Sequence, residues 1–288
     1  MPFTLSHAAA VLPALRTDGT GRGRLVPAVL VAGSFAPDMT YYAASVLPAA
    51  MEFGEFTHSF TGVLTVDVLV AWALVGAWLV LREPLVALLP RGRQGRIGAL
   101  LHCGSPRARF RPLLALWWYV SAVLGALTHV VLDAFTHLDR WGMRVFPVLG
   151  REIAGSPLYW YLQYGGSAVA AVVIAAFVVV ALRRLPTSEP EGASLGVPVL
   201  SVRDRWLAWI VIGGCALVAA VQRAARWWAY RGADAKPLEL IPTVCFGAGA
   251  GLAVGLTAYA VAVRVWRPAP VRPSRAAART EPSRPTPR

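Results

Sequence analysis

Charged residues and cysteines are scarce in this chain of 288 residues. Only 15% of the residues are charged, whereas 56% are hydrophobic. An ordinary soluble domain carries about a quarter charged residues, so the composition argues against that class and indicates a membrane protein.

The few cysteines exclude a thiolate-based design. Cys103, Cys215 and Cys245 stand far apart, two of them inside apolar stretches, and no CxxC pair occurs. We therefore expect neither disulfides nor a thiolate metal site. The sequence also lacks HExxH, which argues against a metalloprotease.

Lysine is nearly absent too, since 27 of the 28 basic residues are arginines and the formal net charge is +13. The arginines gather between apolar stretches and in the C-terminal tail, a pattern typical of membrane topology signals. We therefore expect no nucleic-acid partner.

The opening MPFTLSHAAAVLPALR has no basic residue ahead of its apolar part, so we do not expect a cleaved signal peptide.

Apolar stretches are the main feature that is present. Five of them reach the length of about 20 residues that a membrane-spanning helix needs; they are residues 60–81, 112–135, 158–182, 206–222 and 243–263. A sixth stretch, residues 25–50, is interrupted by Gly33, Pro37, Asp38 and Pro48. We interpret it as a short or re-entrant helix, with a sixth full span as the alternative. The predicted fold is an all-α polytopic membrane protein.

Counting basic residues predicts the orientation, because cytoplasmic loops carry the excess of Lys and Arg. Residues 82–111 hold seven, residues 183–205 hold four and the tail from Arg264 holds seven. The other side receives three in residues 1–57, three in residues 136–157 and four in residues 223–242. We therefore expect a multi-pass protein of the cell membrane, with the second set of segments extracytoplasmic.

This topology gathers four of the five histidines at the extracytoplasmic face. His58 precedes the first span, His129 and His137 flank the end of the second, and His7 lies in the N-terminal segment with Asp38. We expect the fifth histidine, His102, to be a solvated residue of the inner loop.

The stretch LTHVVLDAFTH places His129, Asp133 and His137 four residues apart, so they share one side of a helix. An imidazole and a carboxylate at this spacing can share a divalent cation, and zinc suits nitrogen and oxygen ligands. Ionisable residues at membrane depth are costly, which favours a functional role. The alternative is that they are polar helix-end residues that form interfacial hydrogen bonds.

Four segments resemble an uncharacterised bacterial membrane family, domain of unknown function 4184. They are MPFTLSHAAAVLPALR, VAGSFAPDMTYY, FTHSFTGVL and LTHVVLDAFTHLDRWGMRVFPVL, and the resemblance covers most of residues 1–170. The chain is more distantly similar to membrane-bound metal-dependent hydrolases and to secreted zinc-dependent phospholipases C. The similarity to the phospholipases lies in the order His, Asp, His, then His-x-x-x-Asp.

The resemblance to the phospholipases implies a helical core that holds zinc. The implied ligands of one ion are Asp38, His58, His129 and Asp133; His7 and Asp133 would serve a second ion, so that Asp133 bridges. Asp38 is the implied base. The sequence departs from the phospholipases in lacking a later His-x-x-x-Glu pair, for which Glu152 is a poor substitute, and an N-terminal Trp ligand. One or two ions are therefore expected rather than three.

We expect four parts in the chain: a metal-site membrane domain (residues 1–182), a loop (183–205), two C-terminal membrane helices (206–263) and a flexible basic tail (264–288).

The first hypothesis for the function is a membrane-embedded metal-dependent hydrolase that cleaves a phosphoester or a lipid at the extracytoplasmic face, with Asp38 and Asp133 as catalytic residues. Its metal set is His7, Asp38, His58, His129, Asp133 and His137, with zinc as the expected ion. The alternatives are a non-enzymatic protein that binds or transports a metal ion, and a structural protein whose histidines only satisfy one another.

Overall fold

The computed structural model describes residues 3–102, 112–138, 140–184, 197–232 and 240–267. These residues are mostly helical, and their only β-sheet is a hairpin of β1 (Glu152–Ile153) and β2 (Ser156–Pro157). The flexible segments predicted at residues 186–198 and 267–288, together with Cys103, lie outside the described residues, apart from 197–198 and 267.

Five helices are long and apolar enough to cross a membrane, as predicted. They are α6 (Val66–Ala87), α8 (Pro112–Ala134), α10 (Leu158–Arg184), α11 (Val202–Arg231) and α12 (Leu240–Trp266). The shorter helices are η1 (Thr4–His7), α1 (Ala8–Val11), η2 (Leu12–Ala14), α2 (Pro27–Phe35), η3 (Ala36–Asp38), α3 (Met39–Ala43), η4 (Pro48–Met51), α4 (Gly54–Thr57), α5 (Phe60–Leu64), α7 (Arg91–His102), α9 (Trp141–Val145) and η5 (Pro147–Gly150).

Two predicted span boundaries were wrong. The first span begins at Val66 rather than at residue 60, because the backbone breaks at Thr65 (φ −125°, ψ −88°) and leaves α5 as a separate helix. The fourth span continues past Gln222 to Arg231. The loop predicted at residues 82–111 also contains a helix, α7, which ends at His102.

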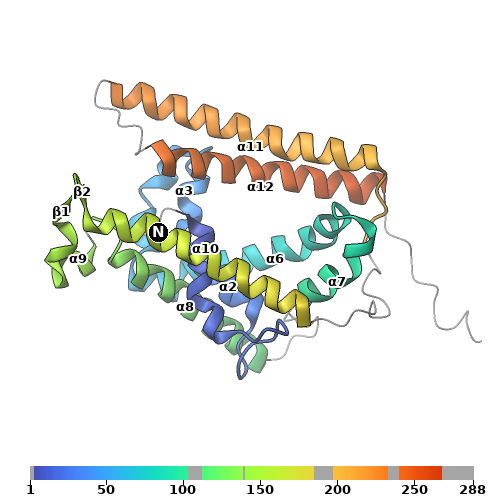
Figure 1. Cartoon of the computed structure of the whole chain (residues 1–288), viewed down its shortest axis with the longest axis horizontal. Helices are drawn as coiled ribbons and strands as arrows, with labels where there is room; N and C mark the ends of the chain where they lie inside the picture. Colours follow the sequence, from blue (N-terminus) through green and yellow to red (C-terminus); the bar gives the residue numbers. More distant parts are fainter. Residues whose placement is uncertain (1–2, 103–111, 139, 185–196, 233–239, 268–288) are drawn as a thin grey trace, which may run out of the picture.

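The two ends of the helix bundle differ in the side chains that they carry. His7, His58, His129 and His137 meet at one end, which we call the histidine end. The other end holds α7 and the last turns of α10 and α12; there Arg96 donates to the carbonyl of Leu182. We call it the arginine end. In Figure 1 the histidine end lies to the left and the arginine end to the right.

The N-terminal segment is re-entrant. It leaves the histidine end through α1 and η2, turns back where Leu15 pairs with Gly21, and returns through α2. Helix α2 has nine residues, so it is about 14 Å long and spans less than half of a bilayer core of about 30 Å. Residues 25–50 thus form short helices, as predicted, and no helix long enough for a sixth span is found among the described residues.

The path of the N-terminal segment changes the number of basic residues on each predicted side of the membrane. Arg16, Arg22 and Arg24 were assigned to the same side as the histidines, but their loop lies at the arginine end. Arg184 donates to the Thr17 hydroxyl at 2.7 Å, and the Arg24 guanidinium lies 5.9 Å from the Trp117 ring centroid. Moving these three residues raises the count predicted from the sequence for the cytoplasmic side from 18 to 21 of the 28 basic residues. Periodicity cannot reveal a segment that enters a bundle and returns.

Glycines allow α2 and α8 to cross in backbone contact. A Cβ atom on Gly125 would overlap the carbonyl oxygen of Leu30, and one on Gly33 would lie 2.5 Å from the carbonyl oxygen of Ala122. The crossing places Ser34 beside His129. Close helix approach through small residues is a common way to pack membrane helices.

Helices α11 and α12 form a hairpin along one edge of the molecule (Figure 1). Gly247, Gly251 and Gly255 of α12 face the backbone of α11 so closely that a Cβ on any of them would overlap it. The hairpin is tied to the histidine end because Arg223 donates to the carbonyl of Tyr41 and to the Ser45 hydroxyl.

The glycine crossing gives a testable prediction. The added methyl group in Gly125→Ala must push α2 away from α8, and overpacking of this kind costs about 1–3 kcal/mol. Gly76→Ala is the matched control, because a Cβ at Gly76 of α6 meets open space. We expect a lower thermal unfolding midpoint in detergent for Gly125→Ala and no decrease for Gly76→Ala. Equal midpoints for the two variants would contradict this account of the crossing.

Candidate metal centre

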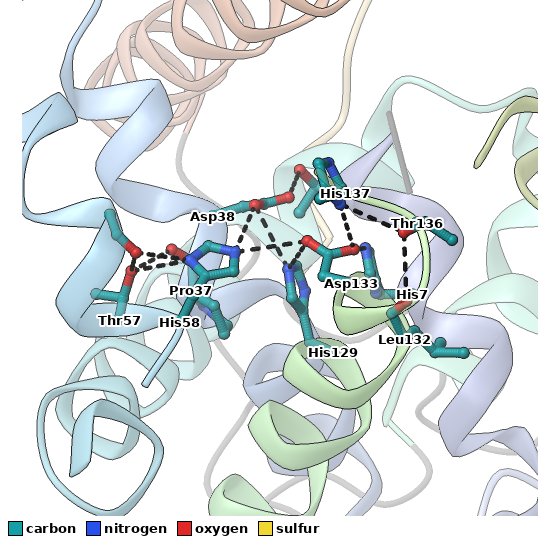
Figure 2. Close-up of polar contacts among 12 residues, drawn as sticks. His7, Pro37, Asp38, Thr57, His58, His129, Leu132, Asp133, Thr136 and His137 are labelled. Atoms are coloured by element: carbon teal, nitrogen blue, oxygen red, sulfur yellow. Dashed lines mark hydrogen bonds and ion pairs between the residues drawn. The ribbon is translucent and has the colours of Figure 1, made fainter. Parts of the chain in front are cut away.

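Four side chains converge at the histidine end: Asp38, His58, His129 and Asp133. One nitrogen or oxygen of each lies within 4.8 Å of the others, and all four residues are buried. They come from η3, from the end of α4 and from the last turns of α8. Figure 2 shows the two imidazoles pointing at the two carboxylates. The four residues implied as the ligands of one ion are thus together.

The four nitrogen-to-oxygen distances suit a shared divalent ion. His58 Nε2 lies 3.5 Å from Asp38 Oδ1 and 3.6 Å from Asp133 Oδ2; His129 Nε2 lies 3.4 Å from each of the same oxygens. A charge-assisted hydrogen bond brings such atoms to about 2.7–2.9 Å. A tetrahedral zinc ion at about 2.0–2.1 Å from its ligands separates them by about 3.3–3.4 Å. The observed distances match the ion better than the hydrogen bond.

Backbone carbonyls fix which nitrogen of each imidazole faces the centre. His58 Nδ1 lies 2.8 Å from the Gly54 carbonyl oxygen, and His129 Nδ1 lies 2.7 Å from that of Ser34. A carbonyl only accepts, so each Nδ1 carries a hydrogen, and in a neutral ring Nε2 then presents a lone pair. Two such lone pairs and two carboxylate oxygens face one another, an arrangement that requires a positive charge among them.

The two remaining histidines face the other oxygen of Asp133. His7 Nε2 lies 3.4 Å and His137 Nδ1 lies 3.5 Å from Asp133 Oδ1. The His7 ring stacks on that of His129, with centroids 3.6 Å apart, and neither nitrogen of His7 has a hydrogen-bond partner among the described residues. The structure therefore brings all six predicted metal residues together, four around one point and His7 and His137 on the far side of Asp133.

His137 differs from the others in exposure. Its side chain is 36% exposed, whereas the His7 and His129 side chains are 0% exposed. Its Nε2 lies 3.0 Å from the amide nitrogen of Gln163 in α10. Gln163 therefore packs its amide against the cluster from the third long helix.

Neighbouring groups orient Asp38. The Thr4 hydroxyl donates to Asp38 Oδ2, and Thr57 Oγ1 donates to the carbonyl of Pro37 at 2.8 Å. Thr57 Oγ1 also lies 3.4 Å from His58 Nδ1, although the shortest contacts of the His58 and His129 rings are to the carbonyls of Gly54 and Ser34. Thr128, which precedes His129, donates within its own helix to Gly125. Carbonyl partners carry no sequence signal, so sequence reasoning missed them, as it missed Thr4.

Electrostatics agree with a cation in this cluster. Burial disfavours the charged form of His58, but hydrogen bonding to Asp133 and Asp38 outweighs it and raises the pKa of His58 above its ordinary value. Burial opposes ionisation of Asp38 as well, yet His129 and His58 hold the pKa of its carboxyl below the usual range. Burial and the adjacent His129 lower the pKa of His7. A metal ion would replace the proton that the two carboxylates otherwise hold on His58.

Two other acidic residues stand apart from the cluster. Asp67 in the first turn of α6 is fully buried, and neither of its carboxyl oxygens has a hydrogen-bond partner among the described residues. Glu152, the substitute for a missing ligand, lies exposed in β1.

Metal content gives the direct prediction. His58→Ala and His129→Ala each remove one of four buried ligands, so we expect each to lose most of the divalent metal that the wild type retains after dialysis. His102→Ala, the same substitution in α7, should retain it. Elemental analysis of detergent-purified protein measures the difference, with size-exclusion profiles as the check on folding. Equal metal content in all four proteins would contradict the site.

Comparison with known proteins identifies a family without a described activity. A family model described as "Domain of unknown function (DUF4184)" matches residues 1–261. No curated protein and no solved structure matches the chain. The matched region includes the five long helices except the end of α12, and all six clustered residues. The chain therefore belongs to the DUF4184 family.

Proposed function

We propose that this protein is a membrane-embedded metal-dependent hydrolase that cleaves a phosphoester or lipid substrate at the extracytoplasmic face. The observation that carries the proposal is the buried set of two imidazole nitrogens and two carboxylate oxygens at separations of 3.4–3.6 Å. Zinc is the proposed ion, because it suits a tetrahedral set of nitrogen and oxygen ligands.

The position of the site supports an interfacial substrate. Asp133 lies in the last turn of α8, so the cluster sits near one end of a membrane-crossing helix rather than halfway along it. Most of the described basic residues lie at the arginine end, so we propose that this end faces the cytoplasm and the histidine end the opposite side. A phosphoester at the level of lipid headgroups is the substrate closest to this position.

Asp133 connects two proposed ion positions. Its Oδ2 belongs to the first, which has four protein ligands and resembles a closed structural site. Its Oδ1 faces His7 and His137, and we propose a second, more open ion position on that side, outside the four-residue set. Catalytic zinc sites keep such an open coordination position, so we place the reaction beside His7 and His137.

A divalent ion there would lower the pKa of a water molecule to about 7 and polarise a phosphoryl oxygen. Asp133 and His7 would hold the ion, and burial of His7 would exclude bulk water from its side of the site. His137, the exposed histidine of the cluster, is placed to contact the substrate. Asp38 fits a ligand better than the base expected from the sequence, because one oxygen faces the histidines and the other accepts from Thr4.

Hydrolysis of a phosphodiester tests the proposal. Zinc-loaded protein in mixed micelles should cleave bis(p-nitrophenyl) phosphate or a phospholipid. His7→Ala should lower kcat/KM by at least about 100-fold, since a metal-held nucleophile is lost, while it keeps the first ion. Glu152→Gln, an exposed acid outside the cluster, should keep full activity. Released nitrophenol or phosphate measures the rates, and elemental analysis gives the ion count.

One result would favour the non-enzymatic alternative. The first position has four buried protein ligands, which is also what a protein that only stores or carries an ion would show. Full metal occupancy with no cleavage of any phosphodiester or carboxylic ester tested would support that alternative and contradict the hydrolase proposal.

A further inference from the structure

The arginine end carries a hollow of about 500 Å³ that is separate from the metal centre. Its lining residues are Leu15, Arg16, Thr17, Asp18, Arg22 and Arg184. Three guanidinium groups face one carboxylate there, so the hollow has an excess of positive charge.

Two segments far apart in the sequence build this hollow. The loop after η2 folds into a tight turn in which the Arg16 amide donates to the Thr20 carbonyl and the Arg22 amide to the Ala14 carbonyl. Gly19 takes a positive φ of 84°, which a residue with a side chain rarely adopts. Arg184 at the end of α10 donates to the Thr17 hydroxyl at 2.7 Å and ties the turn to that helix. The arginines are therefore held by an ordered framework.

The acidic residue of the hollow does not neutralise its arginines. Asp18 Oδ1 accepts from the backbone amide of Thr20 at 2.8 Å and from its hydroxyl at 2.7 Å. These two hydrogen bonds and, more weakly, the nearby charge of Arg16 lower the pKa of Asp18, but no close ion pair joins Asp18 to an arginine among the described residues. The Arg16 guanidinium donates to the Gly21 carbonyl, which is uncharged. The arginines of the hollow therefore keep positive charge that can attract an anion from outside the turn.

The hollow lies at the depth of lipid headgroups. Helix α10 has 27 residues and is therefore about 40 Å long, whereas the hydrocarbon core is about 30 Å thick. The helix ends in the charged pair Arg183 and Arg184, which favours a place for this end at the headgroups rather than in the hydrocarbon. Trp117 near the start of α8 lies beside Arg24, and tryptophans paired with arginines are typical of the membrane interface.

We propose that this hollow binds the phosphate of an anionic phospholipid in the leaflet at the arginine end. Guanidinium groups match the oxygens of a phosphate through paired N–H donors. The turn connects His7 to α2 and Asp38, so a bound lipid would hold the re-entrant segment that carries these two residues. The proposal stands independently of the hydrolase proposal.

Lipid binding to the full chain tests this site. Delipidated protein in a nonionic detergent is titrated with dioleoyl phosphatidylglycerol and, separately, with dioleoyl phosphatidylcholine, and native mass spectrometry counts the bound lipids. We expect saturable binding of phosphatidylglycerol only. In the double variant Arg16→Gln/Arg22→Gln, its affinity should fall by about fivefold for each arginine removed.

The control is Arg144→Gln/Arg151→Gln, which removes two exposed arginines near the histidine end and should bind as the wild type does. If the Arg16/Arg22 double variant aggregates, Arg22→Gln alone should still show the fivefold loss. Unchanged phosphatidylglycerol binding in the arginine-end variants would overturn the proposal. So would inorganic phosphate that binds as tightly as phosphatidylglycerol, because the hollow would then be a site for soluble anions.

Discussion

Electrostatic repulsion among four buried electron-pair donors is the constraint on which the histidine end depends. His58 and His129 each direct Nε2 at both Asp38 and Asp133, while a backbone carbonyl holds the hydrogen on Nδ1. Such an arrangement is stable only with positive charge at its centre. A proton can supply that charge, but the separations of 3.4–3.6 Å suit a divalent ion better.

The rest of the fold brings these donors together at a membrane boundary. The N-terminal segment runs from His7 to a turn at the opposite end and returns to Asp38, and the glycine crossing sets the Ser34 carbonyl against His129. Burial of this polar cluster is costly, so each donor is oriented by a further contact, such as that from Thr4 to Asp38. At the opposite end, the turn of the same segment carries the arginine hollow, so one stretch of chain contributes to both ends.

Much of the helix pattern and of the metal site could be predicted from the sequence. Long apolar runs predicted the five spanning helices, and the four-residue spacing predicted that His129 and Asp133 share a face. The breaks at Gly33 and Pro37 predicted a short helix. The sequence did not reveal that Arg16 lies at the opposite end from His7, because the turn between them has no periodic signal. Nor did it reveal the carbonyls of Ser34 and Gly54, since every residue has one.

The central claim is that Asp38, His58, His129 and Asp133 hold one metal ion. X-ray absorption at the zinc edge, on full-length protein loaded with one equivalent of zinc, tests it most directly. The account predicts four nitrogen or oxygen ligands at about 2.0–2.1 Å, the outer-shell scattering of two imidazoles, and no sulfur. A shell of six oxygens without imidazole scattering, or a shell that contains sulfur, would contradict it.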